Sequence, residues 1–195
     1  MTSRVTRSAG LVLLLALATA ACGSSRNQLP PTSAEADKFL FDKGTQALQD
    51  KKWMAAREYF RQIVDNYPQS TYRPDAKLAV GDAFIGEHTT EALVLAVNEF
   101  REFLTFYPTS PRADYAQFRL ATALAEQMLA PERDQTNTKE AVKELQVFID
   151  RYPNSAIMPE ARALYRRAKD RLSEAGHRVG FFYYRNRYWA GAIDR

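Results

Sequence analysis

Three copies of the pattern Tyr-Pro-x-Ser recur along the chain, and this repetition constrains the fold more than any other feature of the sequence. The copies begin at Tyr67, Tyr107 and Tyr152. Around each copy, alanine stands eleven residues before and nine residues after the Tyr, a large apolar residue stands seven before, and two apolar residues stand four and three before. A chain that repeats at this scale is predicted to fold as an array of similar units.

The apolar offsets have the spacing of one face of a helix, so each Tyr is predicted to end an amphipathic helix. The Pro cannot continue that helix, and the Ser can accept hydrogen bonds from the first free amides of the next one. Ser110-Pro111 is expected to place a capping residue directly before a proline at the first helical position. We therefore predict an all-α solenoid of antiparallel hairpins, in which the small alanines let the helices approach closely.

The first unit resembles the tetratricopeptide repeat, which implies a right-handed superhelix of helical hairpins. The resemblance is carried by Gly44, Trp53, Ala56, Phe60 and Pro68. Successive copies lie 40 and 45 residues apart, more than the usual repeat of about 34. We expect residues near 85–90 and 128–138 to lengthen the turns inside the second and third hairpins.

A fourth unit is predicted from about Ser155 onwards. Its apolar residues recur every three or four positions as far as Phe182, which predicts one long helix with Phe182 in the core. Trp189-x-x-Ala192 then repeats the earlier Trp53-x-x-Ala56, so a further helix is expected to start there. We expect residues 33–195 to form about three and a half hairpins and to be truncated on the C-terminal side.

The N-terminal segment has the order of a secretory signal: arginines, an apolar run at residues 9–21, and small residues before Cys22. The run is shorter than the roughly 20 apolar residues that span a membrane. The segment resembles a lipobox, which implies that residues 1–21 are cleaved and that Cys22 is lipidated. The polar stretch 22–32 is then a flexible tether. The alternative is a plain secretory signal followed by an unpaired cysteine.

The composition argues against most catalytic and metal-binding sites. One Cys and two His leave no material for a cysteine-rich zinc site, an intramolecular disulfide or most histidine relays. Without residues 1–21 the chain has 25 Lys and Arg against 23 Asp and Glu, a net charge of +2, which is too small to favour nucleic-acid binding. We expect no catalytic residue, no metal, and charged helix faces or a polar turn at Glu99, Glu102, Asp134 and Glu140.

Three further stretches narrow the resemblance. They are residues 133–138, the turn at 152–155, and the aromatic run at 179–184 followed by Trp189-x-x-Ala192-Ile193-Asp194-Arg195. Together with the repeats they resemble the YfiO (BamD) family of outer-membrane assembly lipoproteins over residues 22–195. The resemblance implies a non-catalytic subunit of the machinery that inserts β-barrel proteins, lipid-anchored at the periplasmic face of the outer membrane. Glycine and not aspartate follows Cys22, which resembles lipoproteins sent to that membrane.

The resemblance also implies partners. They are a barrel-forming subunit with POTRA-type periplasmic domains, other assembly lipoproteins, unfolded outer-membrane β-barrel proteins, and lipid through the anchor, with no cofactor besides the covalent lipid on Cys22. Arg195 falls at the family's interface arginine, and the exposed aromatics expected in this region extend the docking surface to Phe181, Tyr184 and Trp189. The register of the first unit points to Lys38, Phe41 and Thr45 in a groove for substrate peptides; a solvated face explains Lys38 equally well, and Phe41 can belong to the core.

Two other functions fit a periplasmic helical array. The chain can be a lipoprotein scaffold for envelope, peptidoglycan or cell-division complexes, which would copurify with cell-wall enzymes. It can also be an enzyme such as a lytic glycosidase built on a helical platform. The enzyme would need a catalytic domain, and the sequence after residue 155 contains only more repeat.

Overall fold

The computed structural model describes residues 35–194. Contacts divide the chain into residues 1–36 and 37–195, and the predicted signal, the tether with Cys22, and Arg195 lie outside the described residues. Residues 35–194 hold eight helices and no strand, so the predicted all-α class is confirmed. The helices are α2 (Ala36–Gln49), α3 (Trp53–Asn66), α4 (Arg73–Glu87), α5 (Thr90–Phe106), α6 (Ala113–Glu126), α7 (Thr136–Arg151), α8 (Met158–Arg185) and α9 (Trp189–Ile193).

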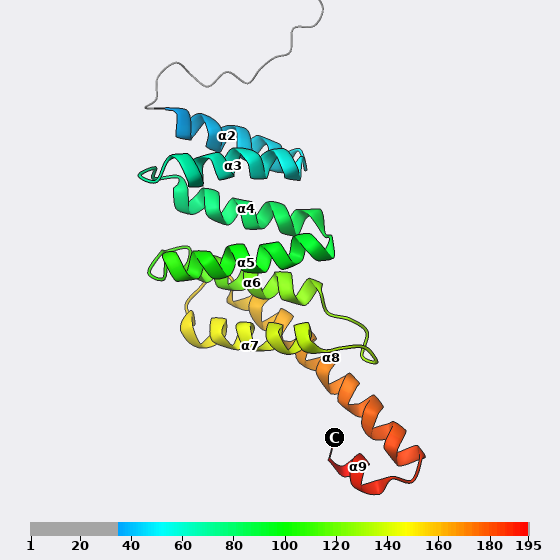
Figure 1. Ribbon diagram of the computed structural model, residues 1–195. Helices are drawn as coiled ribbons and strands as arrows, with labels where there is room; N and C mark the ends of the chain where they lie inside the picture. Colours follow the sequence, from blue (N-terminus) through cyan, green and yellow to red (C-terminus); the bar gives the residue numbers. More distant parts are fainter. Residues whose placement is uncertain (1–34, 195) are drawn as a thin grey trace, which may run out of the picture. The chain divides into compact units, whose positions relative to one another are not determined.

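The helices from α2 to α7 run back and forth and stack in chain order (Figure 1). From α3 to α9 each helix packs on the next, further contacts join α4 to α6 and α6 to α8, and Phe41 of α2 packs on Phe60 of α3. Within residues 35–194 each unit therefore packs against its neighbours in the sequence, as expected for a solenoid. The right-handed twist of the stack stays a prediction.

The repeated alanines lie in the core of the array. All six are fully buried: Ala56, Ala76, Ala96, Ala116, Ala141 and Ala161. The large apolar residues of the same repeats, among them Phe60, Phe100 and Leu145, are also buried and join one continuous core. Since a buried Phe or Leu contributes about 1.5–3 kcal/mol, the repeated positions supply much of the stability of the array.

Two glycines on the first helix of a hairpin face phenylalanines on the second. A Cβ atom added at Gly81 would lie 2.6 Å from a ring atom of Phe100, and one at Gly44 would lie 2.7 Å from the ring of Phe60. The absence of a side chain at these positions lets an aromatic ring rest directly on the backbone of the facing helix.

The Tyr-Pro-x-Ser turns end each helix as predicted, but the next helix starts later than predicted. The Ser110 hydroxyl accepts from the amide of Arg112 at 3.1 Å, and the amide of Ala113 donates to the Ser110 carbonyl at 3.0 Å. These bonds close a separate tight turn before helical hydrogen bonds begin. Helix α6 therefore starts at Ala113, and the prediction that Pro111 is its first residue is wrong.

The turn serines also join successive hairpins. The Ser70 hydroxyl donates to Asp37 Oδ2 at 2.6 Å, and the Ser155 hydroxyl donates to Asp114 Oδ2 at 2.6 Å. Both acceptors lie in the first turn of the first helix of the preceding hairpin. The turn thus fixes the spacing between units as well as the end of a helix.

Of the two predicted long turns, one is confirmed and one is wrong. A segment without helix separates Glu126 from Thr136, and buried Gln135 holds it by donating to the carbonyls of Ala130 and Arg133 at 2.8 and 3.1 Å. Near residues 85–90, only two residues separate α4 from α5, because Thr89 caps α5 by accepting from the amide of Ala92. The second repeat gains length in α5 instead, which has 17 residues against 14 in α3.

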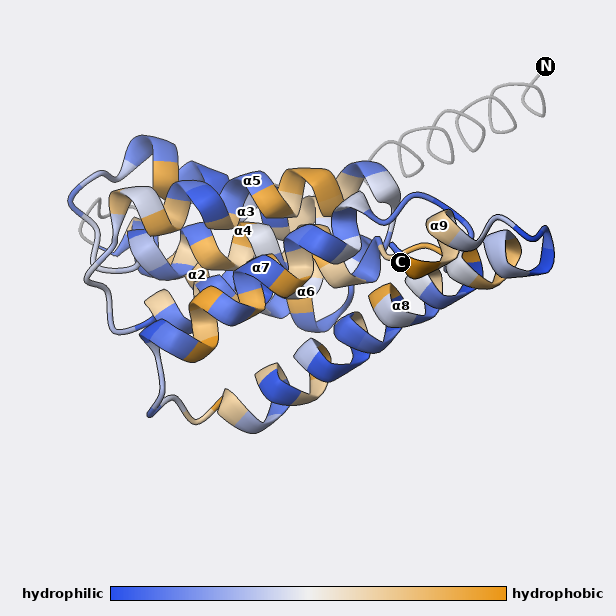
Figure 2. Ribbon diagram, turned by 90° about the horizontal axis from the view of Figure 1, so that it is seen from below, coloured by the Kyte–Doolittle hydropathy of each residue, from blue (hydrophilic) through white to orange (hydrophobic). Residues whose placement is uncertain are grey.

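Helix α8 has 28 residues and extends past α7 (Figure 1). Its last buried residue is Ala175. Phe182 is 57% exposed, so the prediction that it lies in the core is wrong. The reason is length: α7 has 16 residues and cannot cover the C-terminal part of α8. The short helix α9 starts at Trp189, where a further helix was expected, and hydrophobic residues gather where it meets α8 (Figure 2).

Candidate binding surfaces of the repeat array

The residues predicted to line a substrate groove lie on α2. Phe41 packs between Phe60 and Tyr72, with ring centroids 5.6 and 5.1 Å apart. The Thr45 hydroxyl donates to the Phe41 carbonyl at 2.8 Å, and Lys38 is exposed. Phe41 thus packs against the core, and the role of these three residues in substrate binding stays a prediction.

A shallow hollow of about 480 Å³ lies elsewhere, across residues of the first three hairpins. Its apolar lining comes mainly from Leu48, Trp53 and Ile85. Gly86 lies beside the Trp53 ring, since a Cβ there would come within 2.7 Å of it. The polar lining residues are Asp82, His88, Tyr115, Arg119 and Glu126. This combination of an aromatic floor and a few polar groups is typical of binding clefts.

A cluster centred on Asp82 forms the polar side of this hollow. The Tyr115 hydroxyl donates to Asp82 Oδ2 at 2.8 Å, and Arg119 Nε donates to Oδ1 at 2.7 Å. Burial and the negative charge of Asp82 raise the pKa of Tyr115 above its usual value, so Tyr115 stays a neutral donor. Sequence reasoning missed this cluster. The available signal was the i, i+4 spacing of Tyr115 and Arg119, which places both on one face of α6.

The two histidines do not meet. His88 ends α4 with a left-handed backbone, φ 56°, and its Nδ1 lies 2.8 Å from Glu126 Oε2 on the next hairpin. His177 lies on α8 beside Phe181. Within residues 35–194, no group of three His, Cys, Asp or Glu side chains is placed to hold a metal ion.

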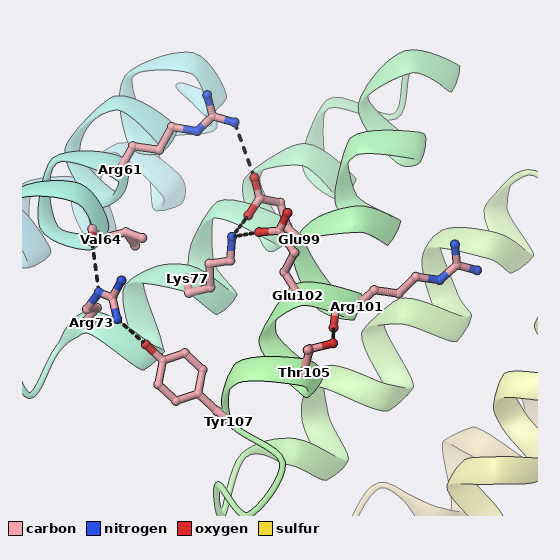
Figure 3. A network of polar contacts seen from close by, with 9 residues as sticks. All are labelled: Arg61, Val64, Arg73, Lys77, Glu99, Arg101, Glu102, Thr105 and Tyr107. Carbon is pink, nitrogen blue, oxygen red and sulfur yellow. Dashed lines mark hydrogen bonds and ion pairs between the residues drawn. The ribbon is translucent and has the colours of Figure 1, made fainter. Parts of the chain in front are cut away.

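Three of the acidic residues singled out in the sequence form ion pairs with other helices, both within and between hairpins. Lys77 Nζ lies 2.5 Å from Glu99 and 2.6 Å from Glu102, and Arg61 approaches Glu99 at 3.4 Å (Figure 3). Burial lowers the pKa of Lys77, but the hydrogen bonds and charges of the two glutamates outweigh burial and raise it above 10.5. Glu140 pairs with Arg101 at 3.1 Å.

The fourth acidic residue, Asp134, precedes α7. It accepts from the amide and the hydroxyl of Thr136, the first residue of that helix. The bond to the amide satisfies one of the free N–H groups at the start of α7. The charged positions thus act in packing and in helix ends.

The aromatic residues predicted to contact a partner form a row along the C-terminal part of α8 and the start of α9. Phe181 and Tyr184 have ring centroids 6.4 Å apart, and Tyr184 lies 5.3 Å from Trp189. Each of the three is more than half exposed. Phe181 and Tyr184 also border a hollow of about 670 Å³ between α8 and α9. Exposed aromatic surface of this kind is typical of protein interfaces, although its partner stays a prediction.

Comparison with known proteins identifies the family. The model of the YfiO family, described as outer membrane lipoprotein, matches residues 33–195. The chain belongs to this family. Among curated relatives, the outer membrane protein assembly factor BamD of Caulobacter vibrioides is 28% identical over 187 residues, which cover 94% of this chain and 59% of the relative.

More distant relatives carry the same name. The outer membrane protein assembly factor BamD of Vibrio cholerae is 26% identical over 184 residues, covering 89% of this chain and 74% of the relative. That of Haemophilus influenzae is 24% identical over 189 residues, covering 93% and 72%. The chain thus spans 59% of the length of its Caulobacter relative. Among the described residues, no helix combines the length and apolar character needed to cross a bilayer.

Proposed function

We propose that this member of the YfiO family is a non-catalytic subunit of the machinery that assembles β-barrel proteins in the outer membrane. The observation that carries the proposal is the family match over residues 33–195, together with relatives named outer membrane protein assembly factor. An array of stacked hairpins suits this role, because solenoids present long surfaces to other chains.

In this proposal, unfolded barrel proteins bind along the first three hairpins. The hollow between Trp53 and the Asp82 cluster offers an apolar floor and fixed polar groups to an extended segment. The predicted contacts of Lys38, Phe41 and Thr45 would extend this surface along α2. Phe41 would contribute through the edge that its packing against Phe60 and Tyr72 leaves exposed.

The C-terminal part of α8, together with the start of α9, would dock on the POTRA-type domains of the barrel-forming subunit. Phe181, Tyr184 and Trp189 supply exposed apolar area, and Arg195, which lies outside the described residues, would pair with a carboxylate. Other assembly lipoproteins would join the same complex. A lipid on Cys22 would hold it to the periplasmic face of the outer membrane, since acyl chains contribute about 0.8 kcal/mol per buried methylene.

Depletion of the chain tests the proposal directly. Outer-membrane porin levels are measured in depleted cells that express the wild-type chain, the Cys22→Ser variant or no chain. We expect porins to fall without the chain and to recover with the wild type. The Cys22→Ser variant should recover part of the porin level, because contacts with partners still hold it. Unchanged porin levels on depletion would refute the proposal.

Copurification separates this function from the alternatives. We expect the chain, pulled down from outer membranes, to bring the barrel-forming subunit with it. Recovery of cell-wall enzymes without that subunit would favour a scaffold for peptidoglycan or cell-division complexes. Turnover of peptidoglycan by the purified chain would contradict the non-catalytic role.

A further inference from the structure

A third hollow, of about 620 Å³, lies between the α6–α7 segment and the C-terminal part of α8. Its α8 wall includes Val179 and Phe182. These residues continue, at spacings of three and four, the stripe of α8 that is buried at Ala168 and Ala175. The wall is therefore an extension of the hydrophobic core that no described residue covers: Val179 is 40% exposed and Phe182 57%.

The opposite wall is charged, and two of its cationic side chains have no partner among residues 35–194. Glu132 pairs with Arg178, and Asp134 is engaged by the amide and hydroxyl of Thr136. The side chains of Arg133 and Lys139 also border the hollow, yet they make no ion pair or hydrogen bond with any residue between 35 and 194. Two unpaired cations thus lie at the edge of an apolar hollow, where one acid, Glu132, is already paired with Arg178 and the other, Asp134, is hydrogen-bonded to neutral donors.

The charged wall is also held in place. Gln135 is buried and binds two carbonyls of the segment, and it accepts from the hydroxyl of Thr138 at 2.9 Å. Arg171 of α8 donates to the carbonyl of Leu129 at 3.1 Å, which ties the segment to the opposite wall. A hollow fixed by such contacts loses little entropy when a ligand binds.

We infer that this hollow binds an extended peptide segment of another protein in which a large apolar side chain stands next to a carboxylate. The apolar side chain lies against Val179 and Phe182, and the carboxylate pairs with Arg133 and Lys139. The lining as a whole carries three cations against two acids, an excess of one positive charge, which favours an acidic segment. The inference goes beyond the proposed function and uses a different side of α8 from Phe181 and Tyr184, which border the other hollow.

A labelled peptide, acetyl-Gly-Ser-Gly-Phe-Asp-Phe-Gly-Ser-amide, tests the site by fluorescence anisotropy. The protein is the full chain with Cys22→Ser, which lacks the lipidation site and is purified without detergent. We expect Phe182→Ser to weaken binding about tenfold, because it removes most of the apolar contact. The matched control Phe181→Ser, equally exposed but outside this hollow, should change affinity less than about twofold. Circular dichroism checks that both variants fold.

A double-mutant cycle between protein and peptide tests the pairing of the peptide carboxylate with Arg133 and Lys139. The variant with Arg133→Ala and Lys139→Ala should bind about tenfold more weakly at about 0.05 M salt and lose that difference at about 0.5 M. Lys143→Ala, elsewhere on α7, is the matched control. A peptide with Asn in place of Asp should bind the wild type as weakly as the double variant, and should lose nothing further on the double variant.

Three results would overturn the inference. They are an absence of binding up to about 1 mM peptide, equal losses for Phe181→Ser and Phe182→Ser, and full displacement of the peptide by laurate. The last result would make the hollow a fatty-acid site. None of these results affects porin levels, so the depletion experiment tests the proposed function independently of this inference.

Discussion

Replacement of Gly81 by Ala tests the close packing inside a hairpin. The new Cβ would lie 2.6 to 2.9 Å from three atoms of the Phe100 ring, which is fully buried. Overpacking costs about 1–3 kcal/mol, and close contact with three ring atoms places this site in the upper half of that range, at about 2–3 kcal/mol. Alanine in a helix gains about 1 kcal/mol over glycine, so we expect a net loss of about 1–2 kcal/mol.

Thermal unfolding followed by circular dichroism measures the effect. For a chain of this size, about 1 kcal/mol shifts Tm by about 2–4 °C, so the variant should melt about 2–8 °C below the wild type. A double-mutant cycle with Phe100→Leu provides the control. Leucine costs stability itself, but it removes the ring atoms that face Gly81, so Gly81→Ala should cost less in that background.

The reasoning is refuted if Gly81→Ala is as stable as the wild type, or if the loss is the same in both backgrounds. The first result would mean that the hairpin is packed more loosely than the structure has it. The second would mean that the cost arises from something other than the Phe100 ring.

Three further predictions follow from the polar contacts. Ser70→Ala should lower the free energy of unfolding by about 1.5–3 kcal/mol in denaturant titrations, because it removes a hydrogen bond to a carboxylate. Ser110→Ala should cost less stability, because the Ser110 hydroxyl accepts from an amide. Equal losses in the two variants would contradict this prediction. Lys77 has a raised pKa, so its contribution to stability is complete below pH 10.5 and is lost as the pH rises through the folded pKa; Lys77→Met should lose less stability than the wild type over that range, as measured by titrations at increasing pH. Tyr115 also has a raised pKa, so Tyr115→Phe should likewise flatten the loss of stability above about pH 10, and an unchanged slope would argue against its burial.

The repeated pattern predicted the array well because the same residues recur where the same contacts are made. Every alanine at the two repeated offsets is fully buried, and each Tyr of the Tyr-Pro-x-Ser pattern caps a helix through its amide. Repetition reduces ambiguity, since a single copy of Tyr-Pro-x-Ser would be only a turn signal.

The failures occurred where one unit departs from the others. Phe182 continues an apolar stripe, but periodicity does not show whether another helix is long enough to cover it. Residues 85–90 do not form a long loop, because the extra residues of the second repeat lengthen α5. Local patterns identify which face of a helix is apolar, while the coverage of that face depends on lengths elsewhere in the chain.

The candidate site was the least predictable part. The register of the first unit pointed to α2, whereas the hollow lined by Trp53 and the Asp82 cluster draws on several helices at once. Asp82 and Tyr115 are 33 residues apart in the sequence, and no short-range pattern joins them. A sequence repeat predicts the spacing of the contacts between units, but it does not predict which individual polar side chains pair with one another.

Because each helix packs on its neighbours in chain order, the array has the mechanics of a spring whose coils are joined in series. A small rotation at every junction adds up along the array and changes the distance between its two ends without opening any hairpin. A force applied to the C-terminal part of α8 passes through one junction after another. The weakest junction between helices therefore sets the force at which the array comes apart, and strengthening any other junction leaves that force unchanged.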